Sequence, residues 1–200
     1  MNTVLLAFEL AVAYLAVIVL TELLRRKYRV SADATRRAMH IFSGFYTIWI
    51  FQILPATEYL TLVLISLVVV VLSKQFNLLT SIHEVKRKTF GEIFLPLGTL
   101  STYFITQANP DIFIPSILVL TLADSFAGIV SDCYKTTKQS WQGSLVFFAT
   151  ASMVLLVTSA TATLLIAPIA LVITLVERYS PLGTDNITVP VSATVLILLF

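Results

Sequence analysis

Residues 112–144 read IFIPSILVLTLADSFAGIVSDCYKTTKQSWQGS, and this stretch decides the fold. Its first part, 112–130, is mostly apolar and close to the length of a helix that crosses a bilayer, so we predict a membrane span. A carboxylate, Asp124, closes the uncharged part of that run. Ionisable groups are costly near a bilayer, which makes Asp124 a candidate functional residue.

The small and polar residues of this predicted helix fall on one face: Thr121, Asp124, Gly128 and Ser131. Such a stripe has two interpretations. One is close helix packing through small residues, with the Asp paired to a neighbour. The other is a metal and phosphate site, with Asp124 as the ligand and Lys135 and Lys138 as phosphate contacts just outside.

The composition indicates a membrane protein. Hydrophobic residues make up 58% of the chain, charged residues 12%, and the mean hydropathy is +0.92. A soluble domain of this size would carry about twice that charged fraction. Cys133 is the single cysteine, which excludes an intrachain disulfide. The N-terminus lacks a basic region and a small-residue cleavage site, so we expect a retained span there and not a signal peptide.

We therefore predict an all-α, polytopic integral membrane protein, a compact bundle of about 7–8 transmembrane helices in one domain over 1–200. The uncharged run 144–176 would reach about 50 Å as one helix, so we divide it into a hairpin turning at 159–163. The segment 74–91 has the pattern of an amphipathic helix on the cytosolic interface. The expected spans are 3–24, 39–54, 59–73, 92–106, 112–130, 144–158, 163–175 and 188–200.

The basic residues predict the orientation. All 13 Lys and Arg residues lie in alternate loops between these spans. The opposite loops, 55–58, 107–111 and 159–162, contain none. Because cytosolic loops are enriched in Lys and Arg, we expect the basic loops on the cytosolic face and both termini on the other side.

Four motifs lie on the predicted cytosolic side. They are RRAMH at 36–40, TFGEIFLPLG at 89–98, the central stretch from Asp124, and SPLGTDNITVP at 180–190. Helical spacing brings Arg36, Arg37 and His40 together. Interfacial anchoring by arginine, with a satisfied interfacial histidine, is the alternative explanation for that group. The fourth motif places Asp185 and Asn186 at the start of the last span.

Together, in this order, the motifs resemble the polyprenol kinase family, which includes dolichol kinase, phytol kinase and CTP-dependent diacylglycerol kinase. The central segment is also similar to the CDP-diacylglycerol synthase signature. Three residues depart from the family pattern, namely Ser131, Asp132 and Gln139. The matching residues are Arg36, Arg37, His40, Gly91, Pro96, Asp124, Ala127, Ser140, Gly143, Ser144, Glu177, Ser180, Pro181, Gly183, Asp185, Asn186, Val189 and Pro190.

The resemblance implies an integral-membrane lipid kinase that moves the γ-phosphoryl group of CTP, or of another nucleoside triphosphate, to a long-chain isoprenoid alcohol such as a polyprenol, dolichol or phytol. Phosphoryl transfer of this kind needs Mg²⁺, for which we expect Asp124 and Asp185 as ligands. His40 joins these two as an expected catalytic residue. The expected nucleotide contacts are Arg36, Arg37, Lys135, Lys138, Ser140, Gly143, Ser144 and Asn186.

Other functions stay open at this point. A cytidylyltransferase that forms a CDP-lipid would use the same metal site. A small membrane transporter would use Asp124 as a coupling carboxylate, although the charged groups gather at one membrane face and transporter sites usually lie near the midplane. A structural scaffold would leave the four ordered motifs unexplained. The expected partners are a lipid alcohol, a nucleoside triphosphate and the bilayer, with no nucleic acid.

Overall fold

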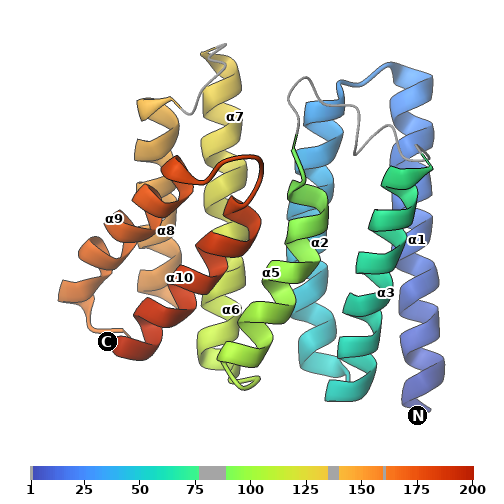
Figure 1. Cartoon of the computed structure of the whole chain (residues 1–200), viewed down its shortest axis with the longest axis horizontal. Helices are drawn as coiled ribbons and strands as arrows, with labels where there is room; N and C mark the ends of the chain where they lie inside the picture. Colours follow the sequence, from blue (N-terminus) through green and yellow to red (C-terminus); the bar gives the residue numbers. More distant parts are fainter. Residues whose placement is uncertain (1, 77–88, 135–139, 160) are drawn as a thin grey trace. The chain divides into compact units, whose positions relative to one another are not determined.

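The computed structural model describes residues 2–76, 89–134, 140–159 and 161–200, and within these ranges the chain is helical with no β-strand. This confirms the all-α fold class (Figure 1). The helices are α1 (Thr3–Tyr28), α2 (Ala32–Ile53), α3 (Ala56–Gln75), α5 (Gly91–Ile105), α6 (Pro110–Leu118), the π-helix η1 (Val119–Asp124), α7 (Ser125–Cys133), α8 (Trp141–Thr158), α9 (Thr163–Tyr179) and α10 (Asp185–Leu199).

The helices are those of a membrane protein. Among the described residues, four helical stretches are long and apolar enough to cross a bilayer: Thr3–Tyr28, Ala56–Gln75, Pro110–Cys133 and Trp141–Thr158. Their outer faces carry large apolar side chains; Phe8, for example, is 66% exposed. A helix that exposes such residues along its length is stable in lipid and would be a liability in water.

Two packing units make up the chain, Met1–Pro96 and Leu97–Phe200, and each is described by itself. In the first unit, α1, α2 and α3 pack on one another. Side chains link α1 to α2 inside the apolar surroundings: the Tyr14 hydroxyl lies 2.8 Å from Ser43 Oγ, and the Tyr46 hydroxyl donates to the Leu10 carbonyl at 2.8 Å. Polar contacts of this kind hold helices together where the hydrophobic effect is weak.

The end of α3 is tied to the start of α5 by one lysine. Lys74 Nζ donates to Glu92 Oε1 at 2.5 Å and to the Thr89 carbonyl at 2.8 Å, and it lies 4.3 Å from the centre of the Phe90 ring. The ion pair is mostly shielded, since only 5% of the Glu92 side chain is exposed. The expected interfacial helix at 74–91 falls largely on residues 77–88, which lie outside the described residues.

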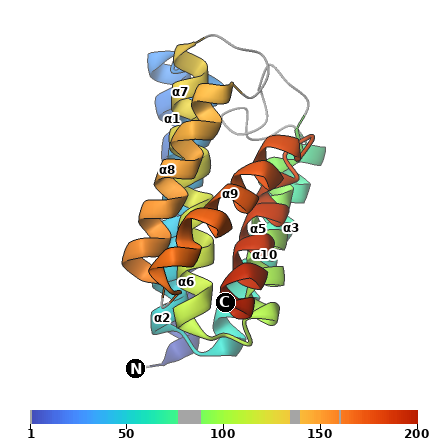
Figure 2. The ribbon, with the colours of Figure 1, turned by 90° about the vertical axis from the view of Figure 1, so that its left-hand side faces the viewer.

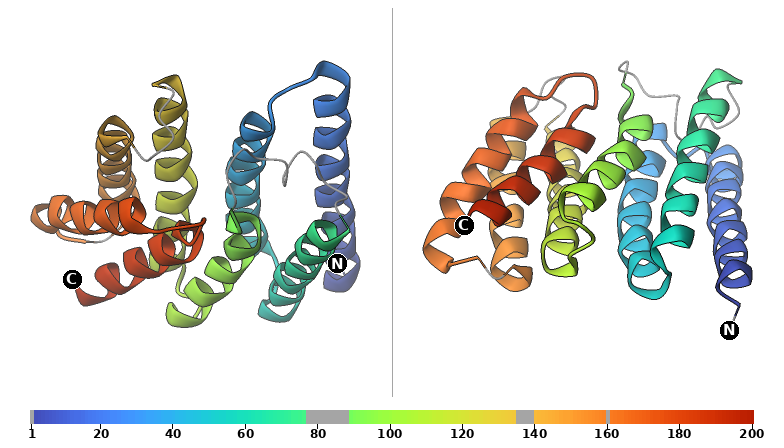
Figure 3. Two further views of the ribbon diagram at one scale, coloured as in Figure 1. Left: turned by 45° about the horizontal axis from the view of Figure 1, so that its top comes forward. Right: turned by 60° about the horizontal axis from the view of Figure 1, so that its bottom comes forward.

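The second unit is built around a long helix. α6, η1 and α7 run continuously from Pro110 to Cys133, as Figure 2 shows. α8 packs along this helix and on α9, while α10 packs on α6, η1 and α9 (Figure 3). α8 ends at Thr158 and α9 begins at Thr163, so the two are separate helices. The single domain expected over 1–200 and the membrane orientation stay predictions.

α7 and α8 approach closely because residue 143 is a glycine. A methyl group at Gly143 would lie 2.3 Å from Ser131 Oγ and 3.1 Å from the Ala127 carbonyl oxygen. Contacts under 3.0 Å do not occur for real Cβ atoms, so the Ser131 hydroxyl would have to rotate away or the helices would have to separate. Small residues at helix interfaces allow such close approach in membranes.

Candidate metal centre

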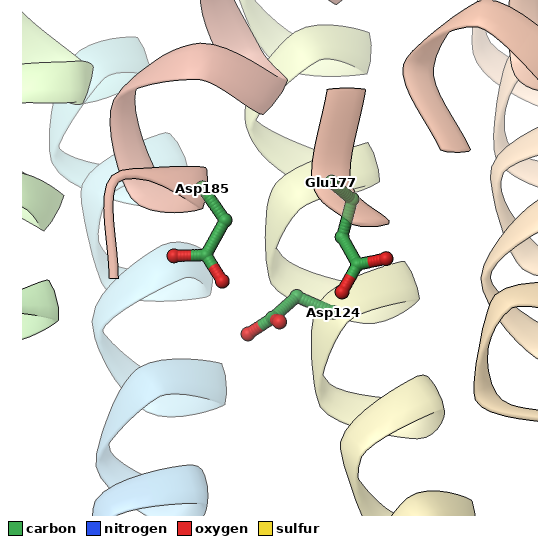
Figure 4. Close-up of side chains that lie close together, drawn as sticks. All are labelled: Asp124, Glu177 and Asp185. Atoms are coloured by element: carbon green, nitrogen blue, oxygen red, sulfur yellow. The ribbon is translucent and has the colours of Figure 1, made fainter. Parts of the chain in front are cut away.

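Three acidic side chains converge inside the second unit. One carboxylate oxygen each from Asp124, Glu177 and Asp185 lies within 4.8 Å of those of the other two. Figure 4 shows the carboxylates pointing toward one another from η1, α9 and α10. Glu177 and Asp185 are buried, with exposed fractions of 5% and 9%, and Asp124 is half-buried. Glu177 and Asp185 are 8 positions apart in the sequence, whereas Asp124 lies 53 positions before Glu177, so the cluster joins distant parts of the chain.

Asp124 is the last residue of the π-helix. In a π-helix the hydrogen bonds join residues five apart, which widens the helix, and such turns often occur at functional sites. η1 covers Val119–Asp124, and its apolar residues are buried, with Val119, Leu120 and Ala123 at 0% exposure. The apolar residues of the wide turn thus pack in the core, while the half-buried Asp124 faces Glu177 and Asp185 (Figure 4).

A tight turn brings Glu177 and Asp185 together. Glu177 lies in the last turn of α9, and Asp185 is the first residue of α10. Between them Leu182 and Gly183 both have positive φ, 55° and 88°. Glycine adopts this conformation at little cost, whereas for leucine it is rare and strained. Strained backbone held by its surroundings is a feature of ligand sites, so this turn marks the cluster as a candidate site.

Hydrogen bonds brace the same turn. Ser180 Oγ lies 2.6 Å from Thr188 Oγ1, which links the end of α9 to the first turns of α10. Ser180 Oγ also contacts the Val176 carbonyl at 2.7 Å, and Thr188 Oγ1 the Thr184 carbonyl at 3.1 Å. The positions of Glu177 and Asp185 are therefore set by a short segment that is held by hydrogen bonds.

The donor set fits a hard divalent cation. Mg²⁺ binds oxygen ligands at about 2.0–2.1 Å in an octahedron, so opposite ligand oxygens lie about 4 Å apart. Oxygens within 4.8 Å of one another are compatible with that size after small side-chain movements. Asp124, Glu177 and Asp185 are thus the described residues that could hold Mg²⁺.

The start of α8 adds polar groups to the same unit. Ser140 caps the helix by accepting from the Gly143 backbone N–H at 2.9 Å, and its Oγ lies 3.0 Å from Ser131 Oγ. Ser144 Oγ accepts a hydrogen bond from Arg178 Nη1 at 2.8 Å. Arg178 directly follows Glu177 in α9, and its guanidinium contacts Ser144 in the first turn of α8, near the positive end of that helix dipole.

The residues predicted from the sequence are distributed as follows. Asp124 and Asp185 lie in the cluster, and Asn186 is the buried residue after Asp185. Lys135 and Lys138 lie outside the described residues. The last group is half-buried on α2 in the first unit, and its place in the site stays a prediction: Arg36, Arg37 and His40.

Two residues of the second unit were not among the predicted site residues. Glu177 matched the family motif but was assigned no role, and Arg178 entered only as a marker of orientation. A signal for Glu177 was present, because it closes the uncharged run 144–176 as Asp124 closes the run before it. No sequence signal pairs Arg178 with Ser144, which is 34 residues away.

The fold and the cluster define a helical membrane protein with a buried carboxylate site between its helices. Comparison with known proteins then shows that the chain is 28% identical over 207 residues to phytol kinase from Synechocystis sp., an alignment that covers 94% of this chain and 88% of the relative. This similarity confirms the resemblance to the polyprenol kinase family. No family model matches the chain, and no solved structure matches it.

Proposed function

We propose that this protein is an integral-membrane kinase that transfers the γ-phosphoryl group of a nucleoside triphosphate, CTP, to a long-chain isoprenoid alcohol. The observation that carries the proposal is the cluster of Asp124, Glu177 and Asp185 in a chain similar to a phytol kinase over nearly its full length. The similarity supports a prenol-type kinase at the level of the family. The donor and the acceptor are specified by the family resemblance of the motifs.

The reaction needs a metal, an orienting cation and a reactive hydroxyl. Mg²⁺ held by Asp124, Glu177 and Asp185 would neutralise charge on the phosphates during transfer. The alcohol oxygen forms a bond to the γ-phosphorus, the bond from that phosphorus to the β–γ bridging oxygen breaks, and the nucleoside diphosphate leaves. The alcohol proton passes to a base, and His40 stays a catalytic residue predicted from the sequence without an assigned role.

The chain's own residues orient the phosphates. Arg178 donates to Ser144 and lies beside Glu177, which suits a guanidinium that also contacts a phosphate oxygen. The N-terminal turn of α8 carries partial positive charge that favours an anion. From the sequence, Lys135, Lys138, Arg36 and Arg37 would add further cations, with Asn186 as an additional polar contact.

Helix length supports a lipid acceptor. Asp124 lies within Pro110–Cys133, a helical stretch that is long and apolar enough to cross a bilayer. Asp124 lies nine residues before the end of α7, or roughly 14 Å along the helix. A long-chain alcohol keeps its chain in lipid, so it could reach a carboxylate site among membrane helices without leaving the membrane.

The test follows the label in the reaction. Purified protein would receive γ-labelled CTP or ATP with Mg²⁺, and phytol, a polyprenol or diacylglycerol in parallel. A kinase moves the label into a lipid monophosphate, while a cytidylyltransferase leaves it in pyrophosphate and needs a phosphorylated lipid. Glycerol, which has no apolar chain, should not accept the label. Label found only in pyrophosphate would overturn the kinase assignment, and no transfer to any acceptor would favour the transporter.

A further inference from the structure

Gly98 touches the backbone of α10. It lies in the part of α5 that belongs to the second unit, as do the three carboxylates. A methyl group at Gly98 would lie 2.0 Å from the Asn186 carbonyl oxygen, 3.0 Å from the Asn186 carbonyl carbon and 3.1 Å from Ile187 Cα. Only a hydrogen atom fits at this point, because contacts under 3.0 Å do not occur for real Cβ atoms.

The atoms that Gly98 contacts belong to the backbone of α10, so no side-chain rotation can move them away. A clash with the far end of a side chain is relieved by a rotation, but a helix carbonyl moves only with its turn. Asn186 is the residue after Asp185, and both are buried in the first turn of α10, with exposed fractions of 7% and 9%. An increase of the contact from 2.0 Å to 3.0 Å would separate α5 from this turn by about 1 Å, and any movement of the turn would carry Asp185 with it.

Glycine at this position needs a specific reason. Inside a helix it costs about 1 kcal/mol relative to alanine, so alanine would be preferred if the space allowed it. A displacement of about 1 Å affects helix packing, and it also matters at a metal site because Mg²⁺ demands near-ideal octahedral geometry. Sites that act on bound ligands lose function when their ligands move by that amount.

We propose that Gly98 is a positioning residue for the metal centre: its contact with the Asn186 carbonyl holds the first turn of α10 where the Asp185 carboxylate meets those of Asp124 and Glu177. The inference deepens the proposed function, on which it rests for the identity of the cluster as a divalent-cation site. It concerns the placement of one ligand and is independent of the nucleotide and of the alcohol.

The experiment measures metal binding without turnover. Mn²⁺ would be titrated into the purified full-length protein in detergent, and free Mn²⁺ followed by electron paramagnetic resonance. We expect Gly98→Ala to raise the Kd for Mn²⁺ at least tenfold. The Mg²⁺ concentration for half-maximal turnover should rise by a similar factor, while the KM for the alcohol stays unchanged. The control is Ser101→Ala, because the Ser101 hydroxyl donates within its own helix, to the Leu97 carbonyl; this variant should bind Mn²⁺ as the native protein does.

A second substitution separates positioning from general packing. Asp185→Glu lengthens the ligand by one methylene, about 1.5 Å, and should weaken Mn²⁺ binding in the native background. In the Gly98→Ala background the longer side chain compensates for the displaced turn, so Gly98→Ala/Asp185→Glu should bind Mn²⁺ at least threefold more tightly than Gly98→Ala alone. A role in packing alone predicts no such recovery.

The outcomes separate the two proposals. Native protein that does not bind Mn²⁺ would overturn the metal centre and the proposed function together. Native binding with an unchanged Kd in Gly98→Ala would overturn the positioning role alone. A Gly98→Ala protein that does not fold, and is not recovered by Asp185→Glu, would assign Gly98 to folding and would also overturn the positioning role.

Discussion

Glu177 adds a third carboxylate to a site for which two were expected. It is 5% exposed and shares the cluster with Asp124 and Asp185. Glu177→Gln keeps the size and hydrogen-bonding capacity but removes the charge that a hard cation needs. We expect turnover to fall by at least 100-fold and Mn²⁺ binding to be lost, as for Asp124→Asn and Asp185→Asn, with expression unchanged.

The matched control for these variants is Asp111→Asn, since Asp111 is an exposed acid in the first turn of α6 and outside the cluster. Its activity should equal that of the native protein. An active Glu177→Gln protein would show that Glu177 is a packing residue, and an active Asp124→Asn protein would support the close-packing interpretation of the polar stripe.

Arg178 has a different expected effect because its partner is a hydroxyl. Arg178 Nη1 lies 2.8 Å from Ser144 Oγ, and the guanidinium would contact phosphate in the bound state. We expect Arg178→Ala to raise the KM for nucleotide about tenfold with a smaller effect on kcat, as the loss of a ground-state contact does. In a double-mutant cycle with Ser144→Ala the effects should not add, and strict additivity would contradict a shared role.

The individual site residues could be predicted only in part. Asp124 and Asp185 were identifiable because carboxylates beside apolar runs are costly and stand in recognisable motifs. The role of Gly98 was not, because a glycine in a helix looks the same in sequence whether it loosens the helix or touches a neighbouring carbonyl. The partner of Gly98, Asn186, lies 88 positions away, and only the packing of α5 on α10 reveals it.

At the scale of elements, the close contact of α7 with α8 can be tested by exchanging the small residues Gly143 and Ser131 that face each other there. A methyl group at Gly143 would lie 2.3 Å from Ser131 Oγ, where the family pattern has glycine at 131. We expect Gly143→Ala to destabilise the folded protein by about 1–3 kcal/mol, as overpacking does. Ser131→Gly removes the clashing oxygen, so the double variant should recover most of the loss. Unfolding in denaturing detergent measures both, and equal stabilities of the single and double variants would contradict the contact.

The helices themselves were more predictable than their irregularities. Apolar length predicts helices well, because backbone groups in lipid must be satisfied within the segment, and four of the eight expected spans correspond to described helical stretches long and apolar enough to cross a bilayer. The stripe predicted on the central helix assumed a constant α-helical period. The π-helix interrupts that period, so Thr121 is buried at 1% exposure whereas Asp124 is half-buried. The hydrophobic pattern of the sequence does not reveal that one turn of this helix is a π-turn, which holds one residue more than an α-turn.

For the whole molecule, the distribution of basic residues predicts which ends of the helices share a membrane face. In a Cys133→Ser background, which removes the exposed native cysteine, Tyr134→Cys and Pro181→Cys should both label from the cytosolic side. Thr57→Cys should label from the opposite side. Labelling of Pro181→Cys and Tyr134→Cys from opposite faces would contradict the orientation, and with it a cytosolic nucleotide site that includes both α8 and α10.

The π-helix has a further consequence for how this protein can change. A π-turn closes with one residue more than an α-turn, so it absorbs an extra residue without altering the helical phase of the segments on either side. Deletion of one residue within Val119–Asp124 would leave a regular α-helix whose two ends keep their packing faces. Asp124 would then point in a different direction. A single codon thus separates the scaffold from the site, and a sequence that lacks it could retain the helices and lose the chemistry.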